Sequence, residues 1–234
     1  MAFTDRWGGV SDGTYASLDL SRARAGATQE LATNKALLAK AFDVEGFVTM
    51  HQTHGAEVAQ VDRLGSSSPR CDALLTTTPG VALCVTVGDC VPVVLADVDA
   101  GVVAVAHAGR LGVVAGVVPA TLSSMRVCGA ERIEAWLGPH ICGGCYEVPA
   151  AMRDDVADVV PAAFCCTTWG TPALDIGAAV VAQLVRGGCD RVDESGPCTR
   201  ESADLFSYRR QGGASGRLGG LVVLRHRAAE GSPG

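Results

Sequence analysis

Short apolar runs separated by turn residues dominate the middle of the chain. The runs are four to seven residues long and rich in β-branched side chains, which is typical of strands. We therefore predict strands over residues 46–50, 57–61, 73–76, 81–87, 92–96, 102–106, 133–137 and 221–225.

Helical spacing of apolar residues predicts helices before and after these strands. In the first helix, over residues 28–42, Leu31, Leu38 and Phe42 fall on one side and Thr28 is the expected N-cap. Further helices are predicted over residues 112–125, 150–160 and 174–185.

This order of elements favours an α+β (mixed α/β) fold, with a mixed, largely antiparallel sheet flanked by helices. The length of 234 residues suits a single domain, whose core we place at about residues 6–226. The C-terminal tail is rich in Gly, Ser and Pro, so we expect it to fray, with His226 and Glu230 at the surface.

The charge balance narrows the class of partner. The chain has 25 acidic and 19 basic residues and a net charge of −6, which argues against a nucleic-acid or anionic membrane surface. Its start lacks a signal-peptide pattern, and Asp89, Asp97 and Asp99 interrupt its most apolar region. We expect a cytoplasmic protein, in which ten cysteines serve a metal or catalysis more often than disulfides.

The strands around residues 92–106 bring two metal-binding side chains together. If the turn between them lies between Val98 and Asp99, Cys90 faces His107, with Cβ atoms roughly 4.5–5.5 Å apart. A thiolate and an imidazole at that distance can share a metal ion, and His54 is the nearest earlier third donor. The alternative is that the cysteine packs in the core and the histidines form only ordinary hydrogen bonds.

Two further segments carry candidate chemistry. Cys142 and Cys145 form a C-x-x-C motif, which is typical of redox sites or of half a zinc knuckle, although no second C-x-x-C follows. The glycines between them could form an anion-binding turn, or the loop could hold two idle thiols. Residues 206–217 set arginines beside glycines, as in a phosphate or carboxylate clamp or in a solvated basic loop.

Several motifs occur in a fixed order along the chain, among them Arg6-x-Gly8-Gly9-Val10-Ser11, Gln52-Thr53-His54-Gly55, Gly88-Asp89-Cys90-Val91-Pro92, His107-Ala108-Gly109-Arg110 and Phe206-Ser207-Tyr208-Arg209-Arg210. This ordered set resembles a family long described as laccase-like or multicopper polyphenol oxidases, and later as zinc-dependent purine nucleoside phosphorylases. Some members are described as peptidoglycan editing factors.

The resemblance implies a zinc ion held by His54, Cys90 and His107. It also implies phosphorolysis of adenosine, inosine and 5′-methylthioadenosine, deamination of adenosine, and a fold related to toxin deamidases with a cysteine nucleophile. The chain departs from the family at Arg110, where Trp is usual, and at Gly88, where Ala is usual.

A site with three protein ligands leaves the fourth position of a tetrahedral zinc open, as catalysis requires. Besides the three ligands, a carboxylate must move a proton in deamination, and the sequence does not choose among Asp72, Asp89 and Glu57. The cations expected to hold phosphate or substrate are Arg6, Arg110 and Arg209.

Other functions compete with this interpretation. Five histidines without a His-x-His pair are too few for a multicopper oxidase, so copper is the less favoured cofactor. A hydrolase that edits peptidoglycan precursors remains open, as does a thiol hydrolase with Cys90 as nucleophile and His107 as base. We expect a monomer or a homodimer.

Overall fold

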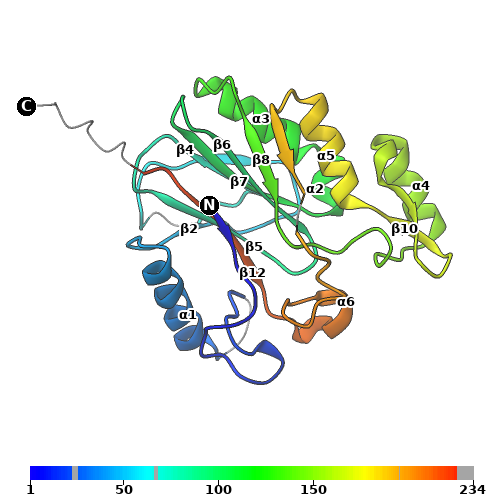
Figure 1. Cartoon of the computed structure of the whole chain (residues 1–234), viewed down its shortest axis with the longest axis horizontal. Helices are drawn as coiled ribbons and strands as arrows, with labels where there is room; N and C mark the ends of the chain where they lie inside the picture. The colour runs from blue at the N-terminus through cyan, green and yellow to red at the C-terminus, as the bar shows by residue number, and fades with distance from the viewer. Residues whose placement is uncertain (23–25, 66–67, 195, 226–234) are drawn as a thin grey trace, which may run out of the picture.

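A computed structural model describes residues 1–22, 26–65, 68–194 and 196–225. In it two β-sheets pack against each other at the centre of the fold (Figure 1). The strands of the six-stranded sheet follow the order β11 (Arg191–Asp193), β8 (Glu134–Leu137), β6 (Val91–Asp97), β7 (Val102–Ala108), β4 (Ala73–Thr76) and β3 (Val58–Gln60). The four-stranded sheet follows the order β1 (Ala2–Phe3), β12 (Leu218–Val223), β5 (Ala82–Val87) and β2 (Val48–Thr49).

Pairing within the sheets is mixed and largely antiparallel, as predicted. Among the named strands of the described residues, six neighbouring pairs are antiparallel and three are parallel. The prediction of one sheet is wrong, because the strands divide between two main sheets and a small pair of β9 (Phe164–Cys166) and β10 (Pro172–Leu174).

Burial on both faces of the central strands explains the division into two sheets. Every residue of β6 and β7 is buried, so these strands are apolar on both sides rather than alternating. One face packs on the four-stranded sheet through Val94 and Val105, which meet Leu83 and Val85. The other face packs on helices in a second core, which includes Val93 and Leu122.

Four helices lie on the side of the six-stranded sheet away from the four-stranded one, and α1 lies on the opposite side of the molecule (Figure 1). These helices are α2 (Arg110–Ala115), α3 (Val117–Val127), α4 (Ala150–Val159) and α5 (Ile176–Arg186), while α1 spans Thr28–Ala41 and the short α6 spans Tyr208–Gln211. Single turns of 3-10 helix occur at η1 (Gly13–Tyr15), η2 (Pro161–Ala163) and η3 (Gly212–Ala214).

Three details of the predicted helices are wrong. The helix predicted over residues 112–125 is broken at Gly116, which ends α2 with a left-handed φ of +86°. Leu174 ends β10, and α5 begins after Asp175, whose side chain caps it by accepting from the Ala178 N–H. Thr28 is the first residue of α1 rather than its N-cap.

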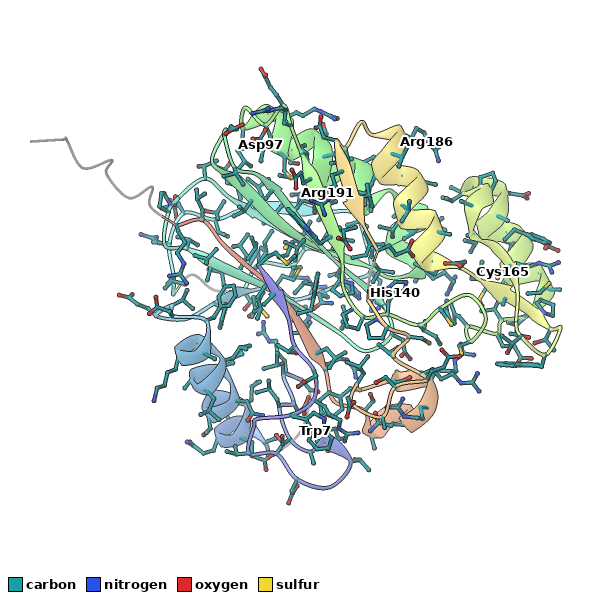
Figure 2. The ribbon with its side chains drawn as sticks, viewed as in Figure 1. Trp7, Asp97, His140, Cys165, Arg186 and Arg191 are labelled. Carbon is teal, nitrogen blue, oxygen red and sulfur yellow. The ribbon has the colours of Figure 1, made fainter. Side chains whose placement is uncertain are left out.

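The register of the β6–β7 hairpin differs from the prediction by two residues. Pro92, not Cys90, pairs with His107, and the loop spans residues 98–101. The Asp97 side chain accepts hydrogen bonds from the backbone N–H groups of Asp99 and Ala100, which favours this longer loop at the end of the hairpin (Figure 2). Because side chains alternate with a period of two, a two-residue shift leaves Cys90 on the same face as His107.

The described residues form one mixed α/β domain. Strand β1 pairs with β12, so the sheet includes residues before the predicted core boundary near residue 6. None of the helices in the described ranges combines the length and the apolar character that a membrane span needs. The tail with His226 and Glu230 lies outside the described residues.

Candidate active site

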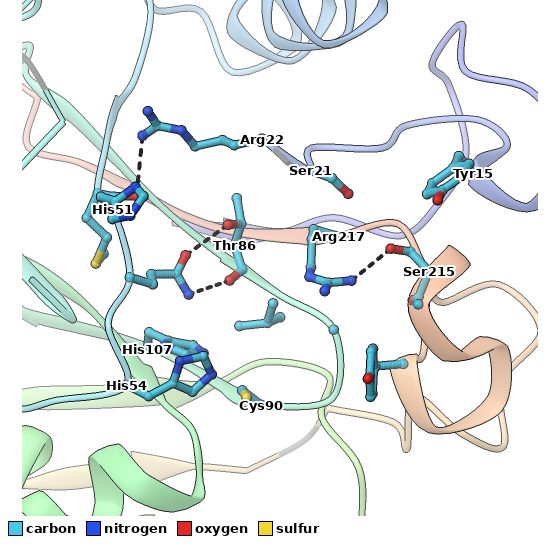
Figure 3. Close-up of a pocket in the computed structure, with 16 residues that line it drawn as sticks. Tyr15, Ser21, Arg22, His51, His54, Thr86, Cys90, His107, Ser215 and Arg217 are labelled. Atoms are coloured by element: carbon cyan, nitrogen blue, oxygen red, sulfur yellow. Dashed lines mark hydrogen bonds between the residues drawn. The ribbon is translucent and has the colours of Figure 1, made fainter. Parts of the chain in front are cut away.

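The structure brings His54, Cys90 and His107 together. His54 lies in the turn after β2, Cys90 directly precedes β6, and His107 belongs to β7. One ligand atom of each residue lies within 4.8 Å of the others, and Figure 3 shows the three side chains converging. The imidazole centroids are 4.8 Å apart and the rings are inclined by 79°.

Asp72 binds the ring of His107 and the backbone of the turn that carries His54. It directly precedes β4 and is fully buried, and its Oδ1 accepts from His107 Nδ1 at 2.8 Å and from the His54 N–H at 2.9 Å. Its Oδ2 accepts from the N–H groups of Thr53 and Gly55 and from the Thr53 hydroxyl. These hydrogen bonds lower the pKa of Asp72 despite its burial, and they leave Nε2 of His107 free to bind a metal.

Charges within the group activate the thiol. Burial alone would raise the pKa of Cys90, but hydrogen bonds and positive charge from His107 and His54 lower it to about 6. Burial would likewise lower the pKa of His107, but Asp72 and the Cys90 thiolate raise it to about 9. The site therefore favours the thiolate, which is the form of cysteine that binds metals.

Asp89 forms a strained turn that presents Cys90. Its φ is +87°, a left-handed conformation that is uncommon for residues other than glycine. Its carboxylate accepts from the Thr199 hydroxyl and from the Arg209 N–H, both at 2.6 Å, and its carbonyl accepts from the Ile141 N–H. The surrounding loops thus hold Asp89 in place.

At Gly109 the backbone passes so close to the Cys90 and His54 side chains that no Cβ atom fits. A Cβ atom at this position would lie 2.9 Å from Cys90 Sγ and 3.2 Å from a ring carbon of His54. Only glycine therefore leaves the three side chains where they are.

The three side chains line a cavity of about 610 Å³. The aromatic rings of Tyr15 and Tyr208 and the guanidinium groups of Arg22 and Arg217 also line it. Figure 3 labels Tyr15 and the two arginines. The volume suits a small organic molecule.

Arg217 lines the cavity and lies in the 206–217 segment, from which the sequence predicts Arg209 instead. Arg217 Nη1 donates to the carbonyls of Ser215 and Gly216, which fixes the guanidinium at the cavity. A Cβ atom at Gly88 would lie 3.0 Å from this Nη1. The absence of a Cβ atom at Gly88 therefore gives the arginine room.

The three cations predicted from the sequence do not line this cavity. Arg6 donates to the carbonyls of Thr14, Ala16 and Ala203, so backbone acceptors occupy its guanidinium. Arg110 and Arg209 lie beside Tyr146 instead. Burial raises the pKa of Tyr146, and the positive charges of Arg110 and Arg209 oppose this rise. The Arg209 guanidinium lies over the Tyr146 ring, 5.0 Å from its centroid.

The remaining predicted candidates lie outside the group formed by His54, Cys90 and His107. Glu57 is exposed and does not line the cavity. Cys142 and Cys145 lie near Cys198 and Glu201, in a second cluster apart from the first. Tyr15, Arg22 and Tyr208 also line the cavity, which no local sequence pattern predicts because these residues lie far from the others along the chain.

A thiolate and two imidazoles are the donor types that zinc prefers, and the cavity adjoins them. Asp72 supplies the carboxylate partner that metal-bound histidines usually have. The residues present therefore fit a zinc ion with one position left for a ligand.

The fold and this site define a mixed α/β protein with a candidate metal centre in a cavity. The chain belongs to the family described as multi-copper polyphenol oxidoreductase laccase, whose model matches residues 1–225.

The chain is 52% identical to a purine nucleoside phosphorylase of Streptomyces coelicolor, with 96% of this chain and 95% of that protein covered. It is 35% identical to an adenosine deaminase of an unknown prokaryotic organism, with 75% and 74% covered. The crystal structure of a Neisseria meningitidis protein described as a DUF152 family model superposes with a TM-score of 0.84, at 32% identity and covering 96% and 93%.

Proposed function

We propose that the protein is a zinc-dependent purine nucleoside phosphorylase. The observation that carries the proposal is the convergence of His54, Cys90 and His107 on a cavity that cationic and aromatic side chains also line. The 52% identity to a purine nucleoside phosphorylase supports the same activity.

The chemistry assigns different parts of the cavity to the two substrates. Arg217 and Arg22 offer planar guanidinium groups that suit inorganic phosphate. Tyr15 and Tyr208 offer rings on which a purine can stack. In phosphorolysis a phosphate oxygen forms a bond to the ribose C1′ while the C1′–N9 bond breaks, and its electron pair leaves with the purine, which takes up a proton.

Zinc, when bound, supplies a positive charge that stabilises negative charge developing on the substrate. The protein's own part is to hold the ligands and the substrates in position. Asp72 accepts a hydrogen bond from Nδ1 of His107, so Nε2 is the ring nitrogen that would bind zinc. Arg22 and Arg217 hold phosphate inside the cavity, next to the zinc-binding side chains.

The test is release of hypoxanthine from inosine by zinc-loaded protein, with and without phosphate. We expect release only when phosphate is present. Cys90→Ala should lose zinc from this site and at least about a hundredfold of the activity. Cys128→Ala, which changes a cysteine outside the cavity, is the matched control and should retain both. Full activity in Cys90→Ala, or equal release without phosphate, contradicts the proposal.

Deamination of adenosine is a second proposed activity of this site, supported by the 35% identity to an adenosine deaminase. Here water replaces the amino group at C6 of adenine, and ammonia leaves. Formation of inosine from adenosine without phosphate tests this activity, and Cys90→Ala should abolish it as well.

The same preparations separate the other candidate functions. Within the described residues, His51 and His140 lie outside the metal-binding groups, so a multicopper centre lacks its imidazoles. Oxidation of phenols by dioxygen that appears only when the protein is loaded with copper would favour the oxidase function instead. Thermal stabilisation by peptidoglycan precursors but not by nucleosides or phosphate would favour the editing function instead.

A further inference from the structure

A second group of metal-binding side chains lies apart from the cavity. It combines the C-x-x-C motif of Cys142 and Cys145 with Cys198 and Glu201, which have the same spacing of three residues. One ligand atom of each residue lies within 4.8 Å of the others. Sγ of Cys145 is 3.5 Å from Oε1 of Glu201, and the Cys142 N–H is 3.4 Å from Sγ of Cys198.

The backbone around this cluster forms two turns that face each other. The Cys145 N–H donates to the Cys142 carbonyl, and the Ser202 N–H donates to the Cys198 carbonyl. A β-bridge between His140 and Cys198 and a hydrogen bond from the Thr199 N–H to the His140 carbonyl join the two segments. The four side chains are therefore held together by main-chain contacts.

Glycine is required inside the first turn. A Cβ atom at Gly143 would lie 2.8 Å from both an Asp175 carboxylate oxygen and Sγ of Cys165, and one at Gly144 would lie 3.0 Å from Thr168. These contacts leave little room for a Cβ atom at either position, so they restrict the backbone between Cys142 and Cys145.

We propose that Cys142, Cys145, Cys198 and Glu201 bind a zinc ion that has a structural role. Three thiolates and one carboxylate form a full tetrahedral set for zinc. With Zn–S bonds of about 2.3 Å, neighbouring sulfurs lie about 3.8 Å apart, so small side-chain rotations close the cluster around an ion. Four protein ligands leave no open position, which distinguishes this site from the one in the cavity.

The position of the cluster indicates what the ion would stabilise. Ile141, next to Cys142, donates to the Asp89 carbonyl, and Thr199, next to Cys198, donates to the Asp89 carboxylate. A zinc ion at the cluster would therefore fix the two segments that support the strained turn before Cys90. The proposal does not depend on the proposed enzymatic function.

Metal stoichiometry of the full-length chain tests the proposal. Protein is stripped of metal under reducing conditions, refilled with zinc, dialysed and analysed by mass spectrometry. We expect two zinc ions per chain in the unchanged protein, one in Cys142→Ser/Cys198→Ser and one in His54→Ala/Cys90→Ala. Cys165→Ser, which changes a neighbouring thiol outside the cluster, should retain two.

Misfolding of the cysteine variants would also remove zinc. A variant at Glu201, the exposed member of the cluster, therefore provides an independent test. Glu201→Gln keeps the three thiols and should lose zinc to a chelator on the order of tenfold faster than the unchanged protein. Zinc should also protect Cys142, Cys145 and Cys198, but not Cys166, from alkylation mapped by peptide mass. Equal alkylation of the three cysteines with and without zinc, or isolation of a disulfide among them in zinc-loaded protein, overturns the proposal.

The stoichiometry also separates this proposal from the first one. One zinc that survives in His54→Ala/Cys90→Ala and is lost in Cys142→Ser/Cys198→Ser supports the second site and contradicts zinc in the cavity. One zinc that is lost in His54→Ala/Cys90→Ala and retained in Cys142→Ser/Cys198→Ser overturns the second site alone.

Discussion

Asp72 is the residue that connects the two histidines of the candidate active site. Its carboxylate accepts hydrogen bonds from the His107 ring, the His54 N–H and the neighbouring N–H groups of Thr53 and Gly55. Because it is fully buried and all of these bonds converge on it, we assign it a positioning role rather than that of a proton shuttle.

Replacing Asp72 should weaken the site without touching a ligand. In Asp72→Asn we expect zinc affinity in the cavity to fall about 10- to 100-fold, because the amide is neutral and donates where the carboxylate accepts. Chelator competition measures the change. Asp62→Asn, at an exposed position, is the control and should bind zinc normally, and unchanged affinity in Asp72→Asn would refute the positioning role.

The ion pair of Cys90 and His107 predicts a pH dependence in metal-free protein. The depressed pKa of Cys90, about 6, contributes stability that is lost as the pH falls through 6. The raised pKa of His107, about 9, contributes stability that is lost as the pH rises through 9. The pair therefore stabilises the fold between these limits.

Alkylation of Cys90 measures this pair directly. Its rate in metal-free protein should reach half its maximum near pH 6, whereas Cys189, whose half-buried thiol has its pKa raised to about 11 by desolvation, should stay unreactive at that pH. His107→Ala should move the midpoint for Cys90 upward. A midpoint near 8.5 in the unchanged protein would show that the pair does not form.

Arg217 should determine phosphate binding. In Arg217→Gln we expect the KM for phosphate to rise about tenfold to a hundredfold with a smaller change in the KM for inosine, since a charged hydrogen bond contributes roughly 1.5–3 kcal/mol. Arg191→Gln, on the exposed edge strand β11, is the control (Figure 2). Equal effects of the two variants would exclude Arg217 from the phosphate site.

At the scale of elements, the pattern of hydrophobic residues predicts where most strands and helices lie, but it does not predict how the strands pair. The strand prediction over residues 73–76 matches β4, and residues 81–87 match β5 to within one residue. The hairpin register was wrong because Asp97 caps its loop through side-chain bonds that periodicity does not show. The prediction that Cys90 lies close to His107 is nevertheless confirmed, because a shift of two residues keeps both side chains on the same face of the sheet.

The junction of β7 and α2 gives a prediction at this scale. In Gly109→Ala we expect loss of zinc from the cavity and of activity with little loss of helix content, because the added methyl group meets Cys90 and His54. Circular dichroism and zinc analysis measure the two effects. Gly46→Ala, where a methyl group meets nothing within 4 Å, should behave as the unchanged protein, and full zinc binding in Gly109→Ala contradicts the described geometry.

At the scale of the whole molecule, two packed sheets bring distant segments to one cavity. Tyr15, Gln52, Cys90 and Arg217 line it although they are far apart in the sequence. The sequence predicts that His54, Cys90 and His107 lie together, from a hairpin and from the resemblance, but it does not predict Arg217 or Tyr15, since their place depends on how the four-stranded sheet packs. For the same reason the sequence does not show that Arg6 lies away from this cavity, where backbone carbonyls of two remote loops accept from its guanidinium.

The measurement that tests the central claim most directly is ³¹P NMR of the zinc-loaded full chain with inosine and phosphate. We predict a ribose 1-phosphate signal that grows in equal amount with hypoxanthine, while inorganic phosphate declines. Inosine that stays intact, or hypoxanthine released with free ribose and no phosphate ester, would contradict the claim that this cavity catalyses phosphorolysis.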